Sequence, residues 1–180
     1  DICAWSIKID DINNIDLKNI LNDEKEILNK NFSKYVVSNY KNWLNSPDER
    51  PILSCDIFNK KLKPIIKKNK QLIFIVIDCL RLDQWKQISP LLKSDYEITE
   101  DTHFSIIPTA TPFARNAIFS GIMPLQIKNN YPEIWNKMFQ ENKLNAYEDQ
   151  LFKNLLESNN FFDRSFHYEK ISNYDQGSKF

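Results

Sequence analysis

The chain has 180 residues, and its 24 basic and 24 acidic side chains give a formal net charge of zero. This balance gives no electrostatic argument for binding to duplex nucleic acid or to a membrane surface. Aromatic residues make up 13% of the chain, with 12 Phe among them, so it has enough apolar material for a core and is not a disordered tail.

The first third of the chain has the spacing of helices. Between residues 17 and 44, apolar residues recur at helical intervals with Asn, Lys and Glu between them. We expect one or two helices that end near Ser46-Pro47, because proline cannot continue a helix. The loop SPDERP follows. A shorter helical stretch then begins near Ser54 and ends in the lysine-rich KPIIKKNK, which we interpret as a solvated helix end.

The pattern changes at residue 71, where the apolar run QLIFIVID (71–78) begins. It shows no alternation of polar and apolar residues, which is typical of a central parallel strand that is buried on both faces. Further helices are predicted at 82–92, 112–120, 132–141 and 146–157, and further strands near 102–107 and 165–171. This order predicts an α/β fold with a mostly parallel sheet, preceded by a helical module. We place the helical middle region at residues 1–69 and the α/β part at 70–180.

Several common functional patterns are absent from the sequence. The only glycines are Gly121 and Gly177, so neither GxGxxG nor GxxxxGK can occur. His103 and His167 have no second histidine at ligand spacing, and we expect structural or surface roles for them. The three cysteines, at positions 3, 55 and 79, form no CxxC pair. They predict reduced thiols in a cytoplasmic protein, and no apolar run is long enough to predict a membrane span.

Asp78 is the first candidate site residue, because it ends the predicted buried strand. In an open α/β sheet, ligands bind beyond the carboxyl ends of the strands. A carboxylate in such apolar surroundings needs a cation or strong donors, and a metal ion would supply that. The alternatives from the sequence are a helix N-cap or a salt bridge to Arg81.

Thr111 is the second candidate, because Thr111-Pro112 has the pattern of an N-cap followed by the first helical residue. The same geometry would place its hydroxyl at a helix N-terminus, where a phosphate or an alkoxide is favoured. Arg115 lies four residues further on and could hold a phosphoryl oxygen, or it could pair with Asp83 or another acid. Thr109 is the competing hydroxyl just before the helix.

The motifs FIVIDCLRLDQW and IIPTATPFARNAIFSGIMP together resemble the PglZ branch of the alkaline phosphatase superfamily. In that superfamily a carboxylate after the first core strand binds a metal, and a Ser or Thr nucleophile opens the next helix, ten residues before a glycine. Thr111 stands ten residues before Gly121, and Asp78 ends the strand. The PTxT pattern is similar to that of the nucleotide pyrophosphatase/phosphodiesterase branch, where the second threonine attacks.

Other stretches resemble the PorX-like family of response regulators in type IX secretion. They are NKNFSKYVVSNYKNWL, PILSCDIF, YPEIW and HYEKISNYDQGSKF. Such proteins join a receiver domain, a helical middle region and a PglZ-type domain. The resemblance implies that the chain is an internal fragment, with the remaining metal ligands beyond Phe180, and that it is inactive by itself.

For the parent protein, the resemblance implies a cytoplasmic, zinc-dependent phosphodiesterase or phosphatase with two zinc ions. Thr111 would be the nucleophile and a metal ligand, Asp78 a metal ligand, and Arg115 a contact to the phosphoryl oxygens. The implied partners are a phosphodiester substrate such as an oligonucleotide or nucleotide, a sensor kinase acting on the receiver domain, and a second copy in a homodimer. Two alternatives stay open: a non-catalytic module that docks to a secretion motor protein or sigma factor, and a PglZ domain of a phage-defence system.

Overall fold

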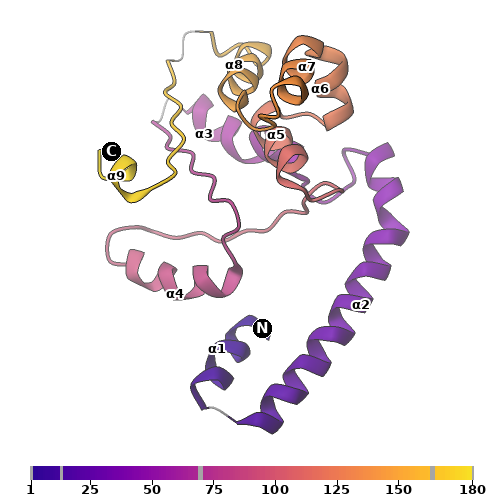
Figure 1. Cartoon of the computed structure of the whole chain (residues 1–180), viewed down its shortest axis with the longest axis vertical. Coiled ribbons are helices and arrows are strands. Elements are labelled where there is room, and N and C mark those ends of the chain that lie inside the picture. The colour runs from indigo at the N-terminus through magenta and orange to yellow at the C-terminus, as the bar shows by residue number, and fades with distance from the viewer. Residues whose placement is uncertain (1, 13, 69–70, 163–164, 180) are drawn as a thin grey trace. The chain divides into compact units, whose positions relative to one another are not determined.

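The computed structural model describes residues 2–12, 14–68, 71–162 and 165–179, and it is largely helical (Figure 1). Helices account for 62% of these described residues and strand for 1%. The helices are α1 (Ile2–Ile12), α2 (Ile15–Asn45), α3 (Lys63–Lys67), α4 (Leu82–Leu92), α5 (Thr111–Ser120), α6 (Pro124–Asn130), α7 (Pro132–Gln140), α8 (Glu148–Ser158) and α9 (Tyr174–Gly177). A 3₁₀ turn, η1 (Ser54–Asp56), and a π-helical turn, η2 (Phe58–Leu62), precede α3.

The described residues form two compact units whose segments interleave along the chain. The first unit takes its residues from 1–51 and 73–102, and the second from 52–72 and 103–180. The chain therefore leaves the second unit after its first segment and returns to it thirty residues later. The predicted boundary between residues 69 and 70 lies outside the described residues.

In the first unit, the long helix α2 contacts α1, and α1 also contacts α4. Asn14 is the N-cap of α2, and its side chain accepts a hydrogen bond from the backbone N–H of Leu17 at 3.1 Å. Leu21 and Trp43 are buried, whereas Ile20, Ile27, Phe32 and Val37 are between 53% and 81% exposed. The predicted end of the helix near Ser46-Pro47 is confirmed, because α2 ends at Asn45 with Ser46 as its C-cap.

In the second unit, α5 lies at the centre and packs on α8, on η1 and on α6. Its core consists mainly of fully buried side chains: Leu53, Phe58, Ile106, Ala117, Ile127 and Leu151. Phe152 of α8 makes edge-to-face contacts with Phe58, Phe119 and Phe166, with ring centroids 5.6 to 6.2 Å apart. Aromatic pairs of this geometry add to the stability that area burial provides. The unit therefore has a core of its own.

The predicted parallel sheet is wrong for the residues that the structure describes. Residues 71–77 are extended but pair with no neighbouring strand, and the side chains of Ile73, Ile75 and Ile77 are 61–85% exposed. Residues 165–171 likewise form no strand, and in 102–107 a single parallel bridge joins Phe104 to Leu53. A strand needs a second backbone for its ladder of hydrogen bonds, and a run of apolar residues does not by itself supply one.

The helix predictions in the second half of the chain are largely confirmed. α4 has the predicted bounds, and α5, α7 and α8 lie within one or two residues of the predicted ones. The short helices α1, α6 and α9 were not predicted from the sequence. Among the described residues, no helix has both the length and the apolar character that a membrane crossing requires.

Candidate functional site

Helix α5 begins one residue earlier than the sequence predicts. Ala110 is its N-cap, with extended backbone angles and no capping side chain, and Thr111 is the first helical residue. Pro112 therefore occupies the second position of the helix, where its fixed backbone angle is still favourable. The prediction of Thr111 as the N-cap is wrong, and its hydroxyl is consequently not used for capping.

The Thr111 hydroxyl is available at the start of this helix. The side chain is partly exposed, and within the described residues its hydroxyl makes no hydrogen bond. Thr109, the competing hydroxyl, is exposed in the loop that precedes α5. Of the two threonines, Thr111 is therefore the one whose backbone is fixed by a helix.

The helix N-terminus offers few backbone donors to an anion. Pro112 has no N–H, and the N–H of Phe113 already donates to the carbonyl of Ala110 at 2.9 Å. Of the first three helical residues, only Thr111 keeps a backbone N–H outside these bonds. A phosphate at this position would rely mainly on side chains or on a bound cation, since helix termini usually attract anions through several such groups.

Gly121 ends α5 and is needed for two reasons. Its φ of +68° lies in the left-handed region, which side chains other than glycine rarely adopt. A Cβ atom at this position would also lie 2.7 Å from Cδ1 of Leu155 on α8. The glycine ten residues after Thr111 therefore allows α5 to end against α8 at short range.

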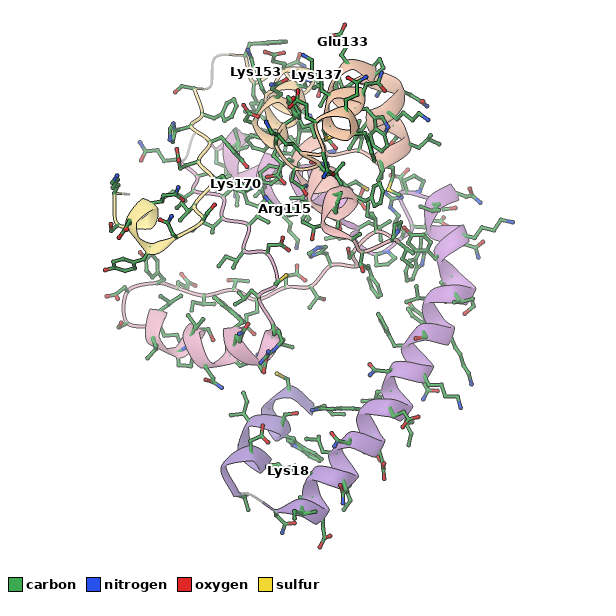
Figure 2. The ribbon with its side chains drawn as sticks, viewed as in Figure 1. Lys18, Arg115, Glu133, Lys137, Lys153 and Lys170 are labelled. Carbon is green, nitrogen blue, oxygen red and sulfur yellow. The ribbon has the colours of Figure 1, made fainter. Side chains whose placement is uncertain are left out.

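Arg115 pairs with Glu148, the first residue of α8. Its Nη2 lies 2.5 Å from Oε2 of Glu148, whose side chain is completely buried. The hydroxyl of Tyr168 donates to the same oxygen at 2.7 Å. Burial, followed by the hydrogen bond to Glu148, raises the pKa of the Tyr168 phenol, which keeps its proton and its role as a donor. Figure 2 labels Arg115 on α5.

Asp78 follows the extended run 71–77 in an exposed turn, and the next residue, Cys79, has a φ of +60°. It is not the N-cap of α4, because Arg81 holds that position. The guanidinium of Arg81 instead donates to both carboxylate oxygens of Asp83, at 2.9 and 2.8 Å. These bonds lower the pKa of Asp83 to about 2.

The structure brings Thr111 and Arg115 together on one helix, while Asp78 belongs to the other compact unit. The pairing of Asp78 with Thr111 at one metal ion stays a prediction. Within the described part of the chain, no group of three or more His, Cys, Asp or Glu side chains could hold a metal. A zinc site needs three or four protein ligands, so the residues present do not complete one.

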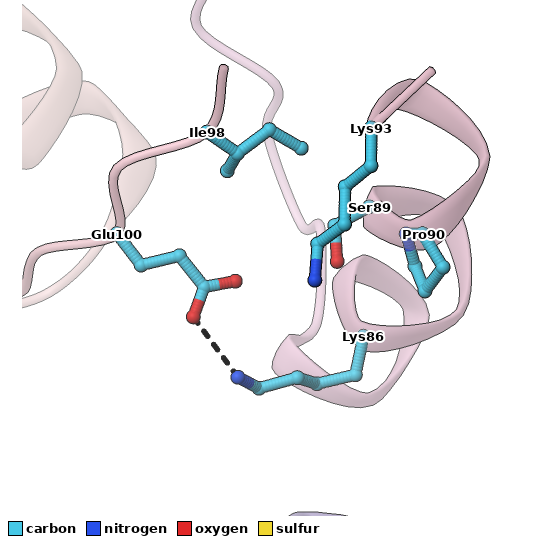
Figure 3. Close-up of a pocket in the computed structure, with 6 residues that line it drawn as sticks. All are labelled: Lys86, Ser89, Pro90, Lys93, Ile98 and Glu100. Atoms are coloured by element: carbon cyan, nitrogen blue, oxygen red, sulfur yellow. Dashed lines mark hydrogen bonds and ion pairs between the residues drawn. The ribbon is translucent and has the colours of Figure 1, made fainter. Parts of the chain in front are cut away.

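A hollow of about 380 Å³ on the first unit contains none of the predicted site residues (Figure 3). It is lined by Lys86, Ser89, Pro90, Lys93, Ile98 and Glu100. The Nζ of Lys86 lies 3.0 Å from Glu100, which also accepts a hydrogen bond from the Trp85 indole at 2.9 Å. Both contacts lower the pKa of Glu100. The charged side chains of Lys86 and Glu100 that line the hollow are therefore paired with each other.

The sequence did not single out Glu148, Asn145 or Tyr168. At the start of a helix, an acidic side chain is usually solvated and interacts favourably with the helix dipole. The residues next to Glu148 in the sequence give no sign that it is buried. The available signal is Arg115 itself, because an arginine on this helix predicts an acidic partner, and Glu148 is that partner.

Comparisons with known families match most of the chain. Residues 57–179 match the model of the BREX system PglZ alkaline phosphatase-like domain. Residues 1–44 match the model of the PorX response regulator linker domain. No curated protein matches the chain. The two matches occur in one chain, as the resemblance to PorX-like regulators predicts.

Proposed function

The chain belongs to the PglZ family, and from this membership we propose that it is part of a PorX-like regulator whose effector domain hydrolyses phosphoric esters. The observation that carries the proposal is the placement of Thr111. Its hydroxyl is partly exposed at the first residue of α5, makes no hydrogen bond within the described residues, and stands ten residues before the left-handed Gly121.

Thr111 is the nucleophile in this proposal. Its Oγ1 forms a bond to phosphorus while the bond from phosphorus to the leaving alcohol breaks. The hydroxyl proton passes to solvent, and the departing alkoxide takes up a proton. Water then cleaves the phosphothreonine ester and restores the hydroxyl. Arg115, four residues further on, is the proposed contact to the non-bridging oxygens.

Zinc is part of the proposal, with Asp78 and Thr111 as two of its ligands, although the described residues do not complete a site. Asp78 is suited to the role because its carboxylate is exposed at the end of an extended segment. The proposal also includes two zinc ions and a phosphodiester substrate. A sensor kinase controls the protein, which forms a homodimer with a second copy. Its location is cytoplasmic, and its role is in type IX secretion.

The test uses the full-length protein with zinc and bis(p-nitrophenyl) phosphate, a simple phosphodiester. Removal of the attacking hydroxyl in Thr111→Ala is expected to lower kcat by about a thousandfold or more, as losses of nucleophiles commonly do. Thr109→Ala is the matched control, because it removes the neighbouring hydroxyl and is expected to keep full activity. Full activity of Thr111→Ala, or inactivity of the wild type with zinc bound, would rule out the assignment.

One observation favours the second candidate, a docking module for a secretion motor protein or a sigma factor. Helix α2 exposes several large apolar side chains, among them Ile20, Ile27, Phe32 and Val37. Exposed apolar residues along one helix are a common feature of protein-binding surfaces. Phe32→Ser would impair regulation without changing hydrolysis if docking is the role, whereas Thr111→Ala would leave regulation intact.

A further inference from the structure

Glu148 is a buried carboxylate that the proposed chemistry does not use. Its side chain has no exposed surface, and three side chains donate to it. They are Arg115 at 2.5 Å, Tyr168 at 2.7 Å and Asn145 at 3.2 Å. A buried carboxylate is costly unless donors of this kind surround it. The sequence therefore places a carboxyl group inside the second unit together with three side-chain donors.

The donors to Glu148 come from three separate parts of the unit. Arg115 is on α5, Asn145 is in the loop before α8, and Tyr168 lies in the extended segment 165–171. Tyr168 also packs edge-to-face on Phe119 of α5, with ring centroids 5.9 Å apart. Glu148 therefore connects α5 to two other elements through one carboxylate.

Asn145 extends this network to Thr111. Its Nδ2 lies 3.2 Å from Oε1 of Glu148 and 3.4 Å from the backbone carbonyl oxygen of Thr111. It also lies 3.4 Å from Oδ1 of Asn116. The buried Asn116 donates in turn to the carbonyl oxygens of Pro112, at 2.7 Å, and Leu144, at 2.9 Å. The carbonyl oxygens of Thr111 and Pro112, the first two residues of α5, thus each accept a hydrogen bond from an asparagine side chain.

We propose that Glu148 is the positioning residue for Thr111. Through Asn145 and Arg115 it fixes the first turn of α5, and with it the direction of the Thr111 hydroxyl. The inference rests on the proposed function of Thr111. The physical reason is that attack requires the reacting atoms to be held about 3 to 3.5 Å apart, and a misplacement of about 1 Å can cost a hundredfold in rate.

A purely structural ion pair would behave differently. Loss of such a pair would reduce the amount of folded protein but leave kcat per folded molecule unchanged. Loss of positioning would lower kcat in the protein that remains folded. KM would change little, because the position of the attacking hydroxyl acts on the chemical step rather than on binding of the ground-state substrate. The ratio of these two kinetic constants therefore separates the two roles.

The experiment compares Glu148→Gln with Glu157→Gln in the full-length protein, with zinc and bis(p-nitrophenyl) phosphate. Glu157 is the matched control, because it lies on the same helix with a side chain that is 46% exposed, 4.0 Å from Lys153. We expect Glu148→Gln to lower kcat by about tenfold to a hundredfold while KM stays within about threefold. The control is expected to match the wild type in both constants.

Tyr168→Phe provides a second test in case Glu148→Gln does not fold. It removes one donor to Glu148 and keeps the aromatic ring beside Phe119. A fall in kcat of about threefold or more, with the fold intact by circular dichroism, would support positioning, since the contribution of one hydrogen bond is of that order. An unchanged kcat in this folded variant would overturn the proposal that Glu148 positions Thr111.

Thr111→Ala, measured in parallel, separates the assignment of Thr111 as the nucleophile from the positioning role of Glu148. If Thr111→Ala is inactive and Glu148→Gln keeps the wild-type kcat, the nucleophile assignment stands and the positioning role is wrong. If the kcat of Glu148→Gln falls only in proportion to its folded fraction, the role is structural and the proposal is also overturned. If Thr111→Ala is active, the proposed function itself fails, and positioning of Thr111 fails with it.

Discussion

Two regions of the molecule carry the predicted site residues, and they differ in how they are held. Helix α5, with Thr111, packs on α8 around a buried polar network. The extended run 71–77, which leads to Asp78, exposes three isoleucines and pairs with no strand among the described residues. The comparison shows that a helix satisfies its own backbone, whereas an extended segment depends on other segments for its hydrogen bonds.

The largest expected difference comes from the same substitution in both regions. Ile106 in the second unit is completely buried, whereas Ile75 is 72% exposed. Ile106→Ala removes packed methyl groups and should lower the free energy of unfolding by about 2 to 5 kcal/mol. Ile75→Ala should change it by no more than about 0.5 kcal/mol. Urea unfolding of both variants tests this, and equal losses would show that 71–77 is as well packed as the core.

A smaller effect is expected where α5 ends. Gly121→Ala would place a Cβ in a left-handed backbone and 2.7 Å from Leu155, so we expect a loss of about 2 kcal/mol. Gly177→Ala is the matched control, because its Cβ would meet Ile171 at an ordinary 3.5 Å. That variant should stay within about 0.5 kcal/mol of the wild type. Thermal unfolding measures both, and a neutral Gly121→Ala would mean that α5 and α8 can separate at little cost.

The smallest effect concerns pH and the other extended segment, 165–171. Unlike 71–77, it is held by a buried contact, from Tyr168 to Glu148. Burial and this hydrogen bond raise the pKa of Tyr168 above the usual value of about 10. The folded protein therefore keeps the proton longer than the unfolded chain, so this contribution to stability is complete below pH 10 and falls as the pH rises further.

Unfolding in urea between pH 8 and pH 10.5 would measure this dependence. The wild type should lose more stability than Tyr168→Phe over the same range, because the variant lacks the phenol. Tyr174→Phe removes a phenol whose side chain is 86% exposed, and it should follow the wild type. Parallel curves for all three proteins would show that the contact to Glu148 does not contribute.

The predictions from sequence succeeded where the signal is local. Helices α4 and α7 follow from apolar spacing and from prolines such as Pro132 near a helix start. The strands failed because a buried strand and an unpaired apolar segment have the same local pattern, and only distant residues distinguish them. The prediction of the site was limited in the same way. Thr111 was selected from its motif and its role stays a prediction, whereas the contacts of Glu148 involve Tyr168 and Arg115, which is thirty-three residues away.

The interleaved order of the two units has a consequence for synthesis of the protein. Residues 52–72 belong to the second unit, but they leave the ribosome before residues 73–102, which belong to the first unit. Phe58, which is fully buried, has its aromatic partners Phe152 and Phe161 much later in the sequence. Until those residues emerge, the apolar side chains of this segment lack these packing partners. Nascent segments of this kind are where chaperones bind and where aggregation starts.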